Sequence, residues 1–102
     1  MCGRVSTFEG VDPDRAAEEA GNIRSQMEGA DVPEGLEGAK GVQTFIDRQS
    51  GKSLAIVLFD SEEDLRRGDE ALNAMSREEG QGRRTSVDFY EVQLNLIRSA
   101  PS

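Results

Sequence analysis

The chain contains no histidine and no tryptophan, and it has a single cysteine among its 102 residues. Histidine is the side chain that most often serves as a general base or a neutral metal ligand near neutral pH, so most ready-made catalytic arrangements are absent. One cysteine excludes an intrachain disulfide and any metal site built on several thiolates. We therefore expect no cofactor and no bound metal.

Long apolar runs and an excess of basic charge are also absent. No stretch approaches the roughly 20 apolar residues that a membrane-spanning helix needs, and the first residues lack the apolar segment of a secretory signal. With 12 basic and 20 acidic residues the formal net charge is −8, which opposes binding to a phosphate backbone. We therefore expect a cytoplasmic protein that binds neither nucleic acid nor membranes.

The composition is typical of an ordered globular protein. Charged residues make up 31% of the sequence and hydrophobic residues 35%, and proline is scarce. The length fits one domain covering residues 1–102, and a domain of this size buries only about 60 to 65% of the surface that its unfolded chain exposes. Association with a second copy would enlarge such a small core.

Six segments carry strand-like or helix-like patterns. β-Branched and aromatic residues predict four strands, at residues 4–8, 42–47, 52–60 and 85–96. Two helices are predicted from their first residues: Asp12 offers an N-cap oxygen ahead of Pro13, and Ser61 precedes three acidic residues. In the turn at residues 48–51, Gly51 is expected to take a positive φ.

Each predicted helix has one apolar stripe. In the first helix the stripe is thin and consists of Ala16, Ala20, Ile23 and Met27. In the second helix it consists of Leu65, Leu72 and Met75. Gly21 lies within the first helix, where glycine costs about 0.5 to 1 kcal/mol relative to alanine, so this helix depends on its packing.

The order of these elements, β-α-β-β-α-β, predicts an α+β fold of the ferredoxin-like kind, a four-stranded antiparallel sheet with both helices on one face. The predicted third strand is apolar on both of its faces from Leu54 to Phe59. Because two helices cover one face, the other face would expose an apolar stripe in a monomer. We therefore expect a homodimer in which two sheets face each other as a barrel.

Several segments carry a likeness to a known family: Arg4-Val-Ser-Thr-Phe-Glu-Gly10, Gly41, Asp47-Arg-Gln-Ser-Gly-Lys52, Leu58-Phe-Asp-Ser-Glu-Glu-Asp-Leu65 and Tyr90-Glu-Val92. In these segments, which span almost the whole chain, the protein resembles the dimeric α+β barrel superfamily and, within it, small proteins similar to antibiotic-biosynthesis monooxygenases. The resemblance implies cofactor-independent oxygenation or isomerisation of a polyketide-like or quinone-like substrate. Barrels of this kind host unrelated chemistries, so the fold alone does not define the activity.

The chain departs from that family where its chemistry is expected. Members that act as cofactor-free oxygenases or degrade haem are expected to use an Asn from strand one, a Trp ending strand three, and often a His on helix two. The matching positions here hold Gly3 and Phe59, and the chain has no His. Without His the usual neutral axial ligand of haem iron is missing, so haem ligation is not expected.

The first four residues, Met1-Cys-Gly-Arg4, resemble the start of SRAP-type proteins, in which an N-terminal Cys captures abasic DNA sites. The likeness ends after these four residues, and the acidic chain lacks the His and aromatic support expected in that family. The net negative charge also opposes contact with DNA. We therefore do not interpret Cys2 as a DNA-reactive nucleophile.

A mostly apolar pocket is expected between the sheet and the helices, suited to a small hydrophobic or aromatic organic molecule. Its walls are predicted to include Val5, Thr7, Ile23, Met27, Val57, Phe59, Leu72 and Met75. Phe59 is expected either to stack on a planar ligand or to pack in the core. Tyr90 donates either to a ligand or to a backbone group, and Arg4 is a candidate to pair with Asp88 or Glu91 across the sheet.

Two classes of function follow from these observations. In the first, the protein is a homodimer that binds a small hydrophobic molecule, or a structural dimer with a filled pocket, and has no catalytic role. In the second, it is a cofactor-independent monooxygenase or isomerase, as the resemblance implies. The missing Asn, Trp and His favour the first class.

Overall fold

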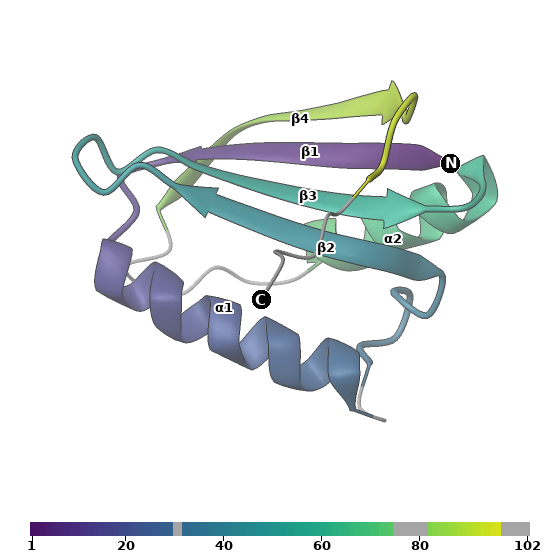
Figure 1. Ribbon diagram of the computed structural model, residues 1–102, viewed down its shortest axis with the longest axis horizontal. Coiled ribbons are helices and arrows are strands. Elements are labelled where there is room, and N and C mark those ends of the chain that lie inside the picture. Colours follow the sequence, from purple (N-terminus) through teal and green to yellow (C-terminus); the bar gives the residue numbers. More distant parts are fainter. Residues whose placement is uncertain (30–31, 75–81, 97–102) are drawn as a thin grey trace.

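The computed structural model describes residues 1–29, 32–74 and 82–96, which form a sheet with two helices packed on one of its faces (Figure 1). The elements are β1 (Cys2–Glu9), α1 (Pro13–Glu28), β2 (Ala39–Ile46), β3 (Ser53–Phe59), α2 (Glu62–Ala74) and β4 (Arg83–Glu91). All strand pairs are antiparallel, in the order β2-β3-β1-β4. This is the ferredoxin-like α+β fold predicted from the sequence. Within the described ranges, neither helix has the length and apolar character needed to cross a bilayer.

The predicted first residues of both helices are confirmed. Asp12 Oδ1 accepts a hydrogen bond from the amide of Asp14 at 3.0 Å, and Pro13 is the first residue of α1. Ser61 Oγ accepts a hydrogen bond from the amide of Asp64 at 3.2 Å where α2 begins. These caps satisfy amide groups that have no partner inside a helix.

A tight turn joins β2 to β3. Gly51 has a φ of 76°, as predicted, and its amide donates to the carbonyl oxygen of Asp47 at 2.9 Å. The side chain of Asp47 accepts hydrogen bonds from the amides of Gln49 and Ser50 at 3.0 and 3.4 Å. These bonds, above all the one from Gln49, lower the pKa of the Asp47 carboxyl because they stabilise its ionised form.

The second strand begins earlier than predicted. The sequence predicts that this strand begins at residue 42, whereas β2 starts at Ala39, which lies opposite Phe59 in the register. A register shift between Ala39 and Gly41 accommodates the extra residue. The glycines of this segment are typical of a loop, so the sequence did not indicate a strand start at Ala39, which depends on pairing with β3.

The last strand ends earlier than predicted, at Glu91 instead of Leu96. β4 lies at the edge of the sheet and pairs with β1 alone, and Cys2, the first residue of β1, lies opposite Glu91. The amide of Val92 still donates to the carbonyl of Met1 at 2.9 Å. Beyond that point β4 has no neighbouring strand, so the apolar alternation of the sequence does not extend the sheet.

β4 also contains a register shift against β1. Thr7 lies opposite Ser86, but the next residue, Phe8, lies opposite Arg84. Thr85 is the extra residue of this bulge, and its Oγ1 donates to the carbonyl oxygen of Thr7 at 3.2 Å. Arg84 therefore lies at the same register position as Phe8.

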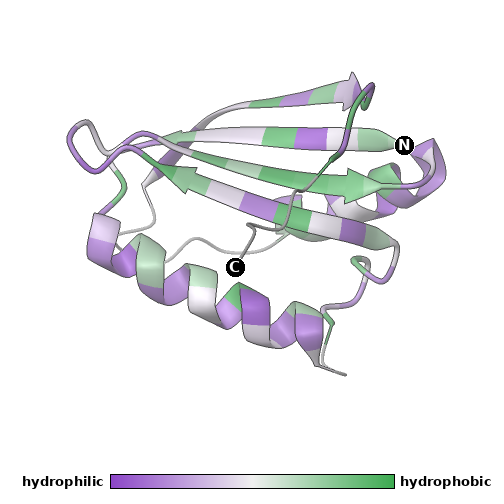
Figure 2. Ribbon diagram, in the orientation of Figure 1, coloured by the Kyte–Doolittle hydropathy of each residue, from purple (hydrophilic) through white to green (hydrophobic). Residues whose placement is uncertain are grey.

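One face of the sheet is left without a helix, as the two-sided apolarity of β3 predicts (Figure 1). Strand alternation places these residues on that open face: Val5, Phe45, Leu54, Ile56 and Tyr90. Three of them, Phe45, Leu54 and Tyr90, are 52%, 37% and 58% exposed, so the isolated chain leaves apolar surface in water. Figure 2 shows hydrophobic residues along much of β3.

α2 packs closely against β3. Phe59 is fully buried and forms the core with Leu36 and Val57. A Cβ atom at Gly68 of α2 would lie 2.6 Å from Phe59 Cε1, closer than carbon atoms approach each other in proteins. The absence of a side chain at Gly68 is therefore what lets α2 lie against this ring.

Replacing Gly68 with alanine is expected to lower the free energy of unfolding by about 1 to 2 kcal/mol, because displacing the Phe59 ring costs more than the helix propensity returns. Gly21→Ala in α1 is the matched control, since a Cβ there meets no atom within 4 Å. The control should raise the free energy of unfolding by about 0.5 to 1 kcal/mol. Urea unfolding followed by circular dichroism measures both changes. Equal stability of the two variants would contradict the close packing of α2.

Candidate functional site

A cleft lies between α1 and the helix-facing side of the sheet. Its volume is about 380 Å³, within the range of about 300 to 1,000 Å³ typical of small-molecule pockets. Side chains of β2 and β3 form one wall, among them Val42, Ala55 and Val57, and side chains of α1 that include Ala20 and Ile23 form the other. Most of the lining is apolar, so the cleft suits a ligand that is largely apolar.

The cleft follows from the small side chains of α1. Three alanines of this helix line it, namely Ala16, Ala17 and Ala20, and no residue of α1 is fully buried. Alanine side chains are too short to fill the space between a helix and a sheet, so α1 covers the sheet without closing on it. α2, by contrast, meets the buried core at Gly68.

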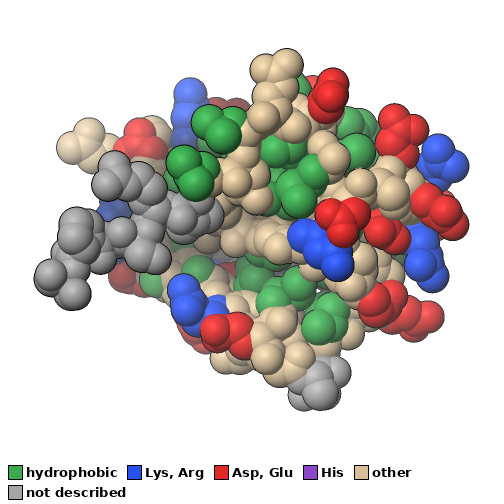
Figure 3. Space-filling view, turned by 45° about the vertical axis from the view of Figure 1, so that its right-hand side comes forward, with side chains coloured by type: hydrophobic (Ala, Val, Ile, Leu, Met, Phe, Trp, Pro, Cys, Tyr) green, Lys and Arg blue, Asp and Glu red, His purple; other side chains and the backbone are tan. Residues whose placement is uncertain are grey.

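Apolar side chains are grouped on the molecular surface as well. In the space-filling view they gather toward the middle of the face shown, while acidic and basic side chains lie mainly toward its margins (Figure 3). Such grouped apolar surface marks sites that bind ligands or partners.

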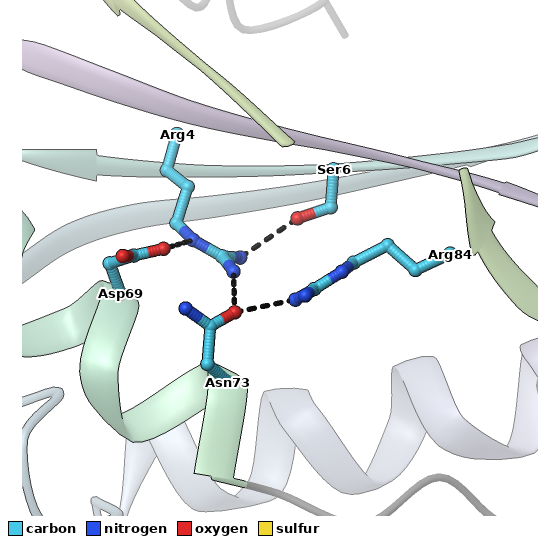
Figure 4. Close-up of polar contacts among 5 residues, drawn as sticks. All are labelled: Arg4, Ser6, Asp69, Asn73 and Arg84. Carbon is cyan, nitrogen blue, oxygen red and sulfur yellow. Dashed lines mark hydrogen bonds and ion pairs between the residues drawn. The ribbon is translucent and has the colours of Figure 1, made fainter. Parts of the chain in front are cut away.

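A network of polar side chains lies beside α2 and extends to the cleft lining (Figure 4). Arg4 of β1 is 4% exposed. Its Nε donates to Asp69 Oδ1 at 2.8 Å, and its two terminal nitrogens donate to Ser6 Oγ at 2.8 Å and Asn73 Oδ1 at 3.1 Å. Asn73 Oδ1 also accepts from Arg84 of β4 at 2.6 Å. Every guanidinium nitrogen of Arg4 thus has a partner, as a buried cation requires.

Half of the predicted pocket residues line the cleft: Ile23, Met27, Val57 and Leu72. They come from α1, β3 and α2, and the fold brings them together around one space. Their part in binding stays a prediction.

The placement predicted for Val5 and Thr7 is wrong. Arg4 and Ser6 point toward the helices, so the alternation of β1 sends Val5 and Thr7 to the open face, opposite Ile56 and Leu54. The sequence pattern gave no means of choosing between the two faces, because β3 is apolar on both.

Phe59 is also not on the cleft wall. It is completely buried against Gly68 and Leu36, so the core alternative holds and the ligand-stacking alternative is wrong. The last predicted pocket residue, Met75, lies outside the described residues.

Two further candidates differ from expectation. Tyr90 lies on the open face at 58% exposure, away from the cleft and not in a buried hydrogen bond. Arg4 pairs with Asp69 of α2 and not with Asp88 or Glu91 of the neighbouring strand. Arg4 turns toward the helices, whereas Asp88 lies opposite Val5 on the open face.

Sequence reasoning missed Asp69, Asn73 and Arg84 as members of the polar network. Asp69 and Asn73 are 65 and 69 positions away from Arg4 in the sequence, so no local spacing connects them. One signal was present: an arginine at a position of β1 that turns out to face the helices needs buried partners. The polar residues on the sheet-facing side of the second helix were the candidates for these partners.

The strand order and the placement of both helices define a ferredoxin-like α+β subunit with a cleft between helix and sheet. A solved structure with this fold is the crystal structure of a mutant of MhuD with two manganese protoporphyrin IX bound per active site. It matches at a TM-score of 0.55 over 94% of this chain and 98% of that chain, with 16% sequence identity. At this identity the likeness establishes the fold alone. No protein-family model and no curated protein matches the sequence.

The residues present do not fit an iron-ligating site. The chain has no His, and among residues 1–29, 32–74 and 82–96 no three of its Cys, Asp and Glu side chains are placed to hold a metal ion.

A haem titration is therefore expected to give no saturable one-to-one shift of the Soret band, because no imidazole can ligate the iron. Apomyoglobin serves as the positive control. A stoichiometric shift at low micromolar haem would contradict this prediction.

Proposed function

We propose that this protein binds a small, largely apolar organic molecule in the cleft between α1 and the sheet. The observation that supports the proposal is the cleft itself, with a volume of about 380 Å³ and a mostly aliphatic lining. Sites for small molecules are usually concave and apolar, with a few polar groups that orient the ligand. The arginine network provides such polar groups.

Binding without catalysis has more support than cofactor-independent oxygenation or isomerisation. Among the described residues, the cleft lining contains no Tyr, Cys or His that could move a proton to or from a substrate, and its one carboxylate, that of Glu19, is ion-paired with Arg15 at 3.8 Å. Its charged groups are arginines and one glutamate, Glu19, at α1. The oxygenase function that the resemblance implies remains the alternative.

We further propose that two copies associate through their open sheet faces. The exposed apolar side chains Phe45, Leu54 and Tyr90 would then be covered by the partner. A sheet with helices on one face ordinarily buries its other face when that face is apolar. This association would leave the cleft on the opposite side of each sheet accessible.

Neutral aromatic compounds such as methyl 2-naphthoate, 1,4-naphthoquinone and anthrone should raise the melting temperature of the protein. A ligand at a hundredfold excess over its dissociation constant stabilises by about 2.7 kcal/mol, which corresponds to several degrees in a domain of this size. Ala55→Phe should remove the effect, because Ala55 lies in the wall of the cleft. Ala74→Phe, at the exposed last residue of α2, should keep it. Binding in the cleft would be refuted if Ala55→Phe kept the shift in melting temperature, as Ala74→Phe should, or if no compound shifted the melting temperature of the unmodified protein.

Light scattering of the unmodified protein should report about twice the chain mass of 11.1 kDa. Leu54→Asp should give a folded monomer, because Leu54 lies on the open face and is already 37% exposed. Val57→Asp is the contrasting variant and should unfold the protein, since Val57 is buried on the helix side and an unpaired buried charge is costly. A monodisperse monomer of the unmodified chain would rule out the dimer.

A further inference from the structure

The charges that line the cleft are opposite in sign to the charge of the whole chain. Among the described residues they are Arg4, Arg48, Arg84 and Glu19, three cations and one anion. The chain as a whole has a formal net charge of −8. Two of these lining charges are paired with neighbours: Arg48 with Asp14 at 3.2 Å and Glu19 with Arg15 at 3.8 Å. The remaining two, Arg4 and Arg84, belong to one network.

That network holds one more positive charge than negative. Asp69 Oδ1 lies 2.8 Å from Arg4 Nε and balances one guanidinium. The second guanidinium, that of Arg84, is joined to the first through the neutral Asn73 Oδ1, which accepts from both (Figure 4). Like charges brought to one neutral oxygen repel each other. An anion beside Arg84 would relieve it.

Arg84 is also able to receive an anion. Ion pairs within the described part of the chain involve Arg4, Arg15, Arg24, Lys40 and Arg48 but not Arg84. Its hydrogen bond to Asn73 uses one terminal nitrogen, and a guanidinium has five N–H donors in a planar fork. The residue is exposed, and it reaches the cleft lining. A carboxylate matches such a fork with two parallel hydrogen bonds.

On the basis of the binding function proposed above, we propose that the ligand of the cleft is an amphipathic organic acid. Its carboxylate pairs with Arg84, and its apolar body lies against Ile23 of α1 and Ala55 of β3. Asn73 orients Arg84, because its Oδ1 accepts a hydrogen bond from that guanidinium at 2.6 Å. The neutral forms of the same molecules bind more weakly.

The test compares 2-naphthoate with its neutral methyl ester at neutral pH, using isothermal titration calorimetry on the 102-residue chain. The acid is expected to bind at least about tenfold more tightly than the ester, as a charge-assisted hydrogen bond provides. Arg84→Gln should reduce acid binding about tenfold and leave ester binding unchanged. Arg84→Lys, which keeps the charge but not the fork, should fall between them.

Arg83→Gln is the matched control, because it removes the same charge from the adjacent residue, which does not line the cleft. It should keep the preference for the acid. Raising the salt concentration from about 0.05 to 0.5 M should weaken acid binding and not ester binding. Melting curves of each variant verify that it is folded.

The possible outcomes separate this inference from the proposed binding function. Equal affinity for acid and ester in the unmodified protein would overturn the anion preference and leave binding in the cleft standing. An equal loss in Arg83→Gln and Arg84→Gln would overturn the assignment of Arg84, since general electrostatic attraction would then explain the preference. Binding of neither compound would overturn both proposals.

Discussion

The contact between the ring of Phe59 and the backbone of α2 at Gly68 is the constraint on which the arrangement of the other elements depends. It fixes α2 close to β3 and supplies the core with Leu36 and Val57. Because α2 lies this close, Asp69 and Asn73, which follow Gly68 in the helix, lie within hydrogen-bond distance of Arg4 on β1. One glycine in α2 therefore determines both the apolar core and the position of the polar network.

The two helices cover the sheet with different closeness of packing. α2 packs tightly and contributes a buried residue, whereas α1 presents alanines to the sheet and buries none of its residues fully. Space in a protein interior is ordinarily filled to crystal-like density. The loose packing of α1 is therefore what leaves the cleft open, and it arises from side-chain size in a single helix.

Most of the fold could be predicted from the sequence because its signals, such as the helix caps and the turn at Gly51, depend on neighbouring residues. The boundaries of β2 and β4 could not, because each depends on where a distant partner strand begins or ends. Four of the residues predicted for the pocket line the cleft between helix and sheet. Val5 and Thr7 were assigned to the wrong face because β3 is apolar on both. The partners of Arg4 lie far along the chain, and only the packing of α2 on Phe59 brings them near.

The bulge in β4 decides which residue of this strand faces the cleft, so the charge of the cleft depends on how β4 is aligned with β1. Were β1 and β4 paired without the shift between Thr7 and Phe8, Thr85 would lie opposite Phe8, and Arg84 would turn to the open face of the sheet. A relative with one inserted residue in β1 at this point would pair without the bulge and would place the Thr85 hydroxyl on the cleft side in place of the Arg84 cation. The charge of the cleft can therefore change through a single insertion in a strand, without any substitution in the cleft itself.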